Sequence, residues 1–258
     1  MNALLEHLER RRSDGRKLLV PYLVAGIPDA MAFGPVLTAV ARYADAVEVG
    51  LPYSDPLMDG PVIAAAAARA IANGVGPIDA LDLTAQHPAT STPRIAMTYY
   101  NPIHRLGDTA FCKRAAHAGF SGLIVPDLPF EEGAGLIEAA SGAGLAWIPL
   151  VSPTSSAQRI EAIVSGATGF VYAVSTLGVT GARASLSERA GAVVGACRDA
   201  TDLPILVGIG VSTPSQAIEA TRVADGVVIG SAVVTRVLEQ GADAAAAFLA
   251  EVRAALDA

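Results

Sequence analysis

Short runs of β-branched and other apolar residues recur along the chain and alternate with longer stretches whose apolar residues follow a helical period. Continuous apolar runs of this length are typical of strands that are buried on both faces, and their alternation with helices makes the sheet parallel. The pattern predicts eight strands, at residues 17–26, 45–50, 94–100, 122–127, 146–151, 169–175, 204–210 and 225–231.

Eight strand–helix units in 258 residues favour one α/β domain over residues 1–258, a closed (β/α)8 or TIM barrel, because such a barrel typically needs about 250 residues. An open, doubly wound sheet is the alternative. Residues 1–12 have the pattern of an extra amphipathic helix before the first strand, and not that of a signal peptide. The interval after the second strand leaves room for one more extra helix.

Composition supports a large core and narrows the range of partners. Hydrophobic residues make up 52% of the chain and charged residues 17%, and the formal net charge of −7 makes nucleic acid a poor candidate partner. No uncharged apolar run approaches the roughly 18 residues that a membrane span requires. Cys112 and Cys197 lie in helical patterns, which favours two buried thiols in a reducing cytoplasm over a disulfide. We therefore expect a cytoplasmic protein that binds small molecules or other proteins.

Three neighbouring strand ends are rich in glycine, at residues 178–181, 208–210 and 230–231. In barrels of this kind the chemistry lies at the C-terminal ends of the strands. Backbone N–H groups can approach a phosphate closely at glycine, and a helix that begins at Ser231 would direct the positive end of its dipole to the same point. Each motif alone is more typical of a tight turn, but three at corresponding positions favour a phosphate site.

The second strand and the loop after it carry three acidic residues. Glu48 lies between Val47 and Val49 on an otherwise apolar strand, so the alternation of side chains directs it to the interior mouth of a barrel. A buried carboxyl group tends to have a raised pKa, which suits a group that both gives and takes a proton near neutral pH. The alternatives are a structural acid for Glu48 and simple turn residues for Asp55 and Asp59.

The side chains that other mechanisms require are missing from these strand ends. The only lysines, Lys17 and Lys113, lie elsewhere, which disfavours a Schiff base. The four histidines are dispersed without metal-ligand spacing, and no dinucleotide-binding fingerprint follows the first strand. We expect proton transfer by carboxylates, with no metal and no cofactor.

The segment at residues 48–61, EVGLPYSDPLMDGP, resembles the signature of the tryptophan synthase α subunit family. The resemblance extends over nearly the whole chain in the same order and spacing. The other matching pieces, from the first strand to the eighth, are VPYLVAG, MTYYNPI, VPDLP, STLGVTG, GIG and GSA. Single pieces such as GIG are unspecific, whereas the second-strand segment is hard to match elsewhere, and the chain is identified as a member of this family.

The family is a lyase of L-tryptophan biosynthesis that cleaves indole-3-glycerol phosphate to indole and glyceraldehyde 3-phosphate by a retro-aldol step. The resemblance implies that Glu48 is the principal acid and base, giving a proton to indole C3 and taking one from the adjacent hydroxyl. It implies that Asp59 binds the ring N–H and that Tyr172 orients Glu48 or the substrate. The implied phosphate-binding residues are Gly181, Gly210, Gly230 and Ser231.

Indole needs an apolar slot with one hydrogen-bond acceptor. Inward strand residues fill a barrel in any case, so each candidate for this slot is also a candidate for plain core. The candidates are Tyr22, Tyr99, Leu123 and Ile229. The stretch 177–187 is rich in Gly, Ala and Ser and looks like a lid, whose closure would bring Thr180 to Asp55 across the mouth.

The resemblance also implies a partner, the tryptophan synthase β subunit, in an α2β2 heterotetramer. Prolines stiffen the loop after the second strand, and a rigid loop loses little entropy on docking. We expect the β subunit to contact this loop and two neighbouring strand ends. The residues at these contacts are Pro52, Asp55, Pro102 and Pro126.

Three other interpretations stay open from the sequence. One is a different phosphate-binding barrel enzyme, such as an isomerase of histidine or tryptophan biosynthesis, which should lack the SDPLMDGP loop. Another is a non-catalytic subunit that senses phosphate and activates a partner, against which both Glu48 and Asp59 argue. The third is a free-standing lyase that releases indole without a partner.

Overall fold

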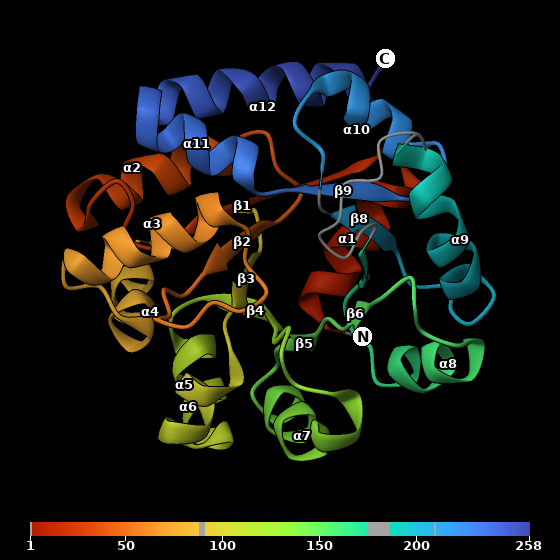
Figure 1. Ribbon diagram of the computed structural model, residues 1–258, viewed down its shortest axis with the longest axis horizontal. Coiled ribbons are helices and arrows are strands. Elements are labelled where there is room, and N and C mark those ends of the chain that lie inside the picture. Colours follow the sequence, from red (N-terminus) through yellow and green to blue (C-terminus); the bar gives the residue numbers. More distant parts are fainter. Residues whose placement is uncertain (1, 88–90, 175–185, 209) are drawn as a thin grey trace.

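The computed structural model describes residues 2–87, 91–174, 186–208 and 210–258 and contains one parallel sheet surrounded by helices (Figure 1). The sheet order is β5-β4-β3-β2-β1-β9-β8-β7-β6, so strands adjacent in the sequence pair with each other except β5 and β6, and the first strand pairs with the last. The strands are β1 (Leu18–Val24), β2 (Val47–Gly50), β3 (Arg94–Met97), β4 (Phe120–Ile124), β5 (Ala146–Trp147), β6 (Leu150–Val151), β7 (Val171–Val174), β8 (Ile205–Gly208) and β9 (Gly226–Ile229).

The short strands β5 and β6 are the two halves of the fifth predicted strand, and they stand at the two ends of the sheet order. Pro149 has no N–H to donate, which interrupts the ladder between the halves. Pairing continues on both sides of the interruption, because Ile148 N donates to Leu123 O at 3.1 Å and Tyr172 N donates to Pro149 O at 3.0 Å. This segment therefore joins both ends of the sheet, and the prediction of an eight-stranded α/β barrel is confirmed.

The helices include the two extra ones that the sequence predicts and two that it does not. They are α1 (Ala3–Ser13), α2 (Ala30–Ala41), α3 (Pro61–Ala72), α4 (Pro77–Ala85), α5 (Tyr100–Leu106), α6 (Asp108–His117), the short 3-10 helix η1 (Phe130–Glu132), α7 (Ala134–Gly142), α8 (Ala157–Ser165), α9 (Leu186–Arg198), α10 (Pro214–Thr221), α11 (Ser231–Gln240) and α12 (Ala242–Leu256).

The predicted helix before the first strand is α1, and α3 and α4 together fill the long interval after β2. The unpredicted divisions, between α5 and α6 and between α11 and α12, each occur at one glycine. Gly107 and Gly241 have φ angles of +90° and +87°, a conformation that ends a helix and that residues with a side chain rarely adopt.

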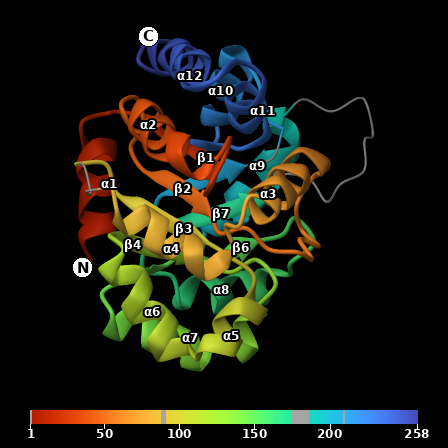
Figure 2. The ribbon, with the colours of Figure 1, turned by 90° about the vertical axis from the view of Figure 1, so that its left-hand side faces the viewer.

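One end of the barrel is closed by α1, which lies opposite the loop between β2 and α3 (Figure 2). Leu4 and Leu8 are fully buried in the same cluster as inward-facing strand residues. Beside them, the buried Asp45 accepts hydrogen bonds from Leu19 N at 2.9 Å, Arg16 Nε at 2.8 Å and Arg253 Nη1 at 3.2 Å. These contacts connect β1, the segment between α1 and β1, and α12 at the closed end, and they leave the other end for a site.

Among the described residues, no single helix is long and apolar enough to cross a membrane; α3 and α4 reach that length only as a pair, with a bend of 80° between them.

Candidate active site

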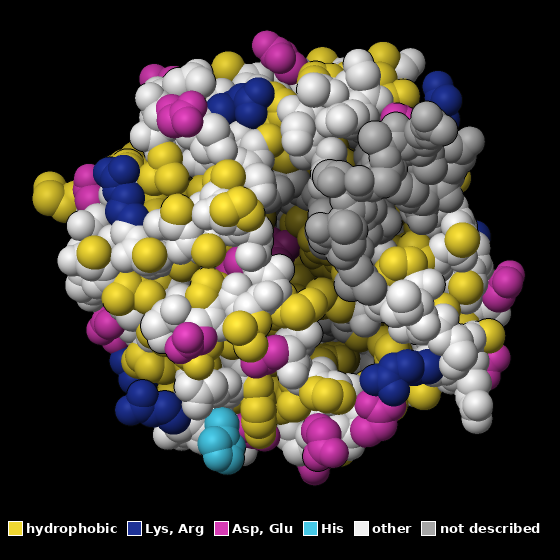
Figure 3. All heavy atoms as spheres, viewed as in Figure 1, with side chains coloured by type: hydrophobic (Ala, Val, Ile, Leu, Met, Phe, Trp, Pro, Cys, Tyr) yellow, Lys and Arg dark blue, Asp and Glu magenta, His cyan; other side chains and the backbone are white. Residues whose placement is uncertain are grey.

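A cavity of about 640 Å³ opens at the carboxyl ends of the strands, and Figure 3 shows it as a hollow near the centre of the molecule with hydrophobic side chains in its depth. Its lining brings together most of the residues that the sequence singles out. The described residues that line it are Tyr22, Glu48, Leu57, Met58, Asp59, Gly60, Ile63, Met97, Ile124, Pro126, Leu150, Tyr172, Val174, Gly210, Val211, Ser212, Val228, Gly230 and Ser231.

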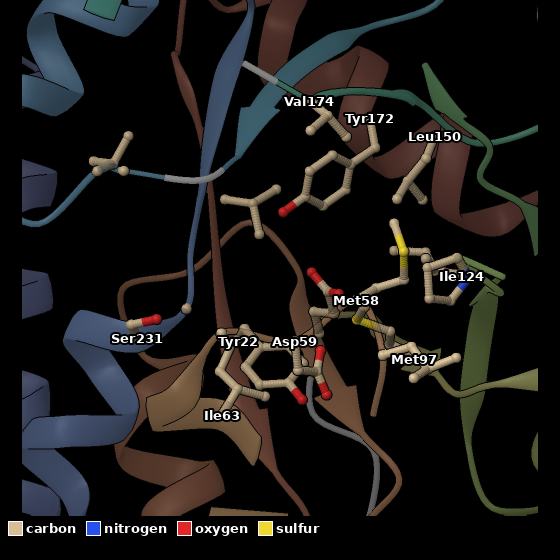
Figure 4. A pocket seen from close by; sticks show the side chains of 18 of the residues that line it. Tyr22, Met58, Asp59, Ile63, Met97, Ile124, Leu150, Tyr172, Val174 and Ser231 are labelled. Carbon is tan, nitrogen blue, oxygen red and sulfur yellow. The ribbon is translucent and has the colours of Figure 1, made fainter. Parts of the chain in front are cut away.

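The cavity has two chemically different sides. Figure 4 shows Ser231, at the start of α11, on one side and Met97, Ile124 and Leu150 on the opposite side. Among the described lining residues there is no lysine, arginine or histidine, and the acidic ones are Glu48 and Asp59. A ligand that fits this arrangement has a flat apolar part at one end and a group held by backbone N–H donors at the other.

Glu48 reaches the cavity because β2 alternates its side chains between the barrel interior and the helices. It pairs with Tyr22 on β1 and Ile95 on β3 and is only 1% exposed. Its Oε2 atom has no hydrogen-bond partner among the described residues. Burial, and then the nearby charge of Asp59, raises the pKa of Glu48 to about 8. The predicted position of Glu48 at the interior mouth is confirmed, and the carboxyl group holds a proton at neutral pH.

Asp59 enters the cavity from the loop between β2 and α3. Burial raises its pKa to about 6, and a hydrogen bond with Tyr99 works in the opposite direction. Because the pKa of Glu48 is about 8, one carboxyl group is neutral and the other is ionised between these two values. Such a pair can supply an acid and an anion at the same pH.

Tyr99 supports the loop that carries Asp59 and does not itself line the cavity among the described residues. Its side chain is 4% exposed, and its hydroxyl accepts a hydrogen bond from Met58 N at 3.0 Å. Its ring lies 5.4 Å from that of Tyr53, whose hydroxyl accepts a hydrogen bond from Asn101 Nδ2. The expectation that Tyr99 forms part of the indole slot is therefore corrected: its hydroxyl positions Met58 and Asp59.

The rings of Tyr22 and Tyr172 each lie over a glycine of the next strand. A Cβ atom on Gly50 would be 2.0 Å from the Tyr22 hydroxyl, and one on Gly208 would be 2.0 Å from the Tyr172 hydroxyl. Real Cβ atoms do not come this close, so these strand positions admit only glycine while the rings stay in place. Both hydroxyls are thereby held beside a strand backbone, and both residues line the cavity as predicted.

The predicted slot residues Leu123 and Ile229 are wrong by one position. Both are fully buried, but they belong to the cluster between the strands and the outer helices. Their neighbours Ile124 and Val228 face the cavity instead. Because successive side chains of a strand point to opposite faces, an error of one residue moves a side chain from the inside of the barrel to the outside.

The side of the cavity at which the sequence predicts a phosphate is built largely from backbone groups. Gly230 precedes α11, whose N-terminus has no side-chain cap, and Ser231 is exposed at the cavity. Gly230 O accepts hydrogen bonds from Val233 N and Val234 N, so the helix starts at two residues that line the cavity, Gly230 and Ser231. Gly210, with φ of +95°, lines the same side. Gly181 and Thr180, and most of the predicted lid, lie outside the described residues.

The four predicted partner contacts differ in their exposure. Pro52 and Pro102 are buried in the chain by itself, and Pro126 lines the cavity. Only Asp55 of the four is exposed. The sequence pattern also missed Leu57, which is 87% exposed between the acidic residues of the same loop, because a lone leucine in a turn gives no signal of its environment.

The cysteines and the other titratable groups add no second centre. Cys112 and Cys197 are buried and free, as predicted, and burial raises the pKa of each thiol to about 11, so both stay protonated. No group of three or more histidine, cysteine or acidic side chains that could hold a metal occurs within the described ranges.

Comparisons with known proteins agree on one family. A family model described as tryptophan synthase alpha chain matches residues 8–256. The chain is 45% identical over 260 residues to a tryptophan synthase alpha chain of Synechococcus elongatus, covering 100% of this chain and 98% of that one. A tryptophan synthase alpha subunit structure from Legionella pneumophila superposes with a TM-score of 0.91 at 34% identity, covering 100% and 99% of the two chains. A tryptophan synthase structure from Mycobacterium tuberculosis gives a TM-score of 0.90 at 37% identity, covering 99% and 98%.

Proposed function

The chain belongs to the tryptophan synthase alpha chain family, whose reaction is the cleavage of indole-3-glycerol phosphate, and from this premise we propose which of its residues carry the reaction. The observation that carries the proposal is the pairing of Glu48 with Asp59 in one apolar cavity, where the pKa values of the two carboxyl groups are raised to about 8 and about 6. At neutral pH this pair presents one proton donor and one anion to a bound substrate.

The cleavage proceeds through protonation of the indole ring. Glu48 gives its proton to C3 of the ring, and the ring nitrogen takes the resulting positive charge. Asp59, as a carboxylate, accepts a hydrogen bond from the ring N–H and stabilises that charge. Glu48, now ionised, then removes the proton of the hydroxyl on the carbon attached to C3. The carbon–carbon bond breaks, its electrons return to the ring, and indole and glyceraldehyde 3-phosphate leave with Glu48 protonated again.

The rest of the cavity fits the two ends of this substrate. The apolar side at Met97, Ile124 and Leu150 suits the indole ring, which has one N–H and otherwise needs no polar partner. The phosphate lies at Gly230 and Ser231, where the start of α11 supplies N–H donors and the positive end of the helix dipole. Backbone donors hold an anion without adding a cation that would lower the pKa of Glu48.

Replacing Asp59 by asparagine tests the assignment in the isolated chain. We expect Asp59→Asn to lower kcat for indole release by about 10²-fold or more, because an amide cannot stabilise a developing positive charge as a carboxylate does. Affinity for glycerol phosphate should stay within about twofold of the parent, since the phosphate end is untouched. Turnover by Asp59→Asn close to that of the parent would remove Asp59 from the mechanism.

The partner is the second part of the proposal. We infer that a tryptophan synthase β subunit receives the indole and docks in an α2β2 assembly on the exposed loop that carries Asp55 and Leu57. The same loop carries Asp59 and is held by the Met58–Tyr99 hydrogen bond. A partner that binds this loop can therefore change the position of the Asp59 carboxylate.

A further inference from the structure

The side chain of Tyr22 shares the cavity with the two carboxyl groups. Tyr22 is 6% exposed and lines the cavity together with Glu48 and Asp59. Figure 4 shows it beside Asp59. Within the described part of the chain, no hydrogen bond engages this hydroxyl. A buried donor that points into a cavity with two carboxyl groups is available to one of them.

The backbone fixes where this hydroxyl is directed. Tyr22 on β1 pairs in register with Glu48 on β2, so both side chains enter the barrel at the same level. The ring extends across Gly50, where a Cβ atom would be 2.0 Å from the hydroxyl. Gly50 is the last residue of β2, and the chain continues from it into the loop that carries Asp59. The ring therefore leans from the level of Glu48 toward the C-terminal end of β2, where Figure 4 shows Asp59 beside it.

The charges around Tyr22 agree with this direction. Burial raises the pKa of Tyr22 well above its usual range, followed by the effects of Asp59, Glu48, Tyr99 and Tyr172, in that order. The hydroxyl is therefore a permanent donor at working pH, and Asp59 is the charged group that affects it most. Tyr172 has the equivalent position on the other side, over Gly208, but Glu48 is the charged group that raises its pKa.

We propose that Tyr22 is a positioning residue whose hydroxyl donates a hydrogen bond to the Asp59 carboxylate in the working site, so that Glu48 and not Asp59 keeps the proton of the pair. The proposal deepens the function proposed above and rests on it. It gives each tyrosine a different carboxyl group: the hydroxyl of Tyr22 acts on Asp59, and that of Tyr172 acts on Glu48.

The physical reason is that two carboxyl groups share one apolar space and neutral pH leaves a single proton to the pair. Burial already favours the proton on Glu48, because Glu48 is buried more deeply than Asp59. A hydrogen-bond donor stabilises the ionised form of the carboxyl group that it reaches, so a donor at Asp59 strengthens this preference. The reaction requires a proton at Glu48 and a negative charge at Asp59, and the reverse arrangement is unproductive.

The pH dependence of kcat/KM for indole-3-glycerol phosphate tests the proposal in the isolated chain. The acidic limb of the profile reports Asp59, which must be ionised, and the alkaline limb reports Glu48, which must be protonated. Tyr22→Phe removes one oxygen atom and keeps the ring over Gly50. We expect it to move the acidic limb up by about one pH unit, which is a tenfold lower kcat/KM below that limb. Thermal unfolding of the variant checks that the fold is retained.

Tyr172→Phe is the matched comparison, because it also removes a tyrosine hydroxyl that lies against a glycine of the neighbouring strand. We expect it to move the alkaline limb and to leave the acidic limb in place. Gly50→Ala displaces the Tyr22 hydroxyl without removing it and should reproduce the acidic shift.

An acidic limb of Tyr22→Phe that coincides with the parent would overturn the inference, and so would equal shifts of the same limb by both phenylalanine variants. The proposed function fails in a different way. If Asp59→Asn keeps the acidic limb, that limb does not belong to Asp59, and the assignment of the carboxyl groups falls with the inference.

Discussion

The raised pKa of Glu48 makes the stability of the fold depend on pH. Its pKa is raised from 4.5 to about 8 in the folded protein because it is buried without a cation. A group with a raised folded-state pKa contributes stability that is fully present below its unfolded pKa and lost as the pH rises through its folded pKa. The free energy of unfolding of the parent therefore falls as the pH rises from 4.5 to about 8, because Glu48 stays protonated only in the folded state.

Glu48→Gln should remove this cost, because the amide stays neutral at every pH. We expect urea unfolding at pH 5 to give similar free energies for parent and variant, and unfolding at pH 8.5 to favour the variant by on the order of a few kcal/mol. Glu251→Gln, on the exposed face of α12, is the control and should follow the parent. Identical pH dependence in parent and Glu48→Gln would mean that Glu48 is ionised in the folded protein at neutral pH.

At the level of single residues, the sequence predicts those whose type is unusual for their place. Glu48 stands out because it interrupts an apolar strand, and Ser231 because it follows a glycine where a helix begins. The contact between the Tyr22 hydroxyl and Gly50 has no such signal, because the two residues lie on different strands and meet only in the folded barrel. The same holds for the hydrogen bond from Met58 to Tyr99.

At the level of elements, the apolar runs predict the number and order of the strands. They do not predict which side chains of each strand face the inside of the barrel. A fully buried strand is apolar on both faces, so its sequence does not mark which residues face inward. This is why Leu123 was expected in the cavity that Ile124 lines. On β2 the single charged residue removes the ambiguity, since Glu48 has to face the cavity.

The proposed phosphate site lies between the segment after β8 and the start of α11, and a substitution of Gly210 tests it. Gly210→Asp places a carboxylate on the cavity wall and should weaken binding of glycerol phosphate by about tenfold or more through charge repulsion. Its backbone, with φ of +95°, is strained by any side chain. Gly210→Asn is therefore the matched control, because asparagine has the same shape and nearly the same backbone preferences. Equal affinities of the two variants, measured by calorimetric titration, would place the phosphate elsewhere.

At the scale of the whole molecule, the barrel has a closed end for stability and an open end for chemistry. Leu4, Leu8 and the ion pairs of Asp45 close the first end. The overall closure was predictable because eight strand–helix units fit the length of one barrel. Which loop carries exposed apolar residues was not, because exposure depends on how the loop folds, as Leu57 shows.

The exposed loop leads to a prediction about the partner. We expect the isolated chain to cleave its substrate slowly and the β subunit to raise its turnover by orders of magnitude. Asp55→Ala should lose most of this activation and leave the basal rate nearly unchanged, because Asp55 is exposed and does not line the cavity. The measurement is indole release with and without a β subunit. Full activity of the chain alone, with no complex in sedimentation, would instead favour a free-standing lyase.

The proposed mechanism depends on Glu48 as the proton donor in an apolar cavity. Its most direct test is the single-turnover rate of indole formation by Glu48→Gln at saturating indole-3-glycerol phosphate, measured on a folded variant with parental affinity for glycerol phosphate. We expect a rate about 10²–10⁴-fold below that of the parent, as for loss of a general acid and base. A rate within a few-fold of the parent would contradict it.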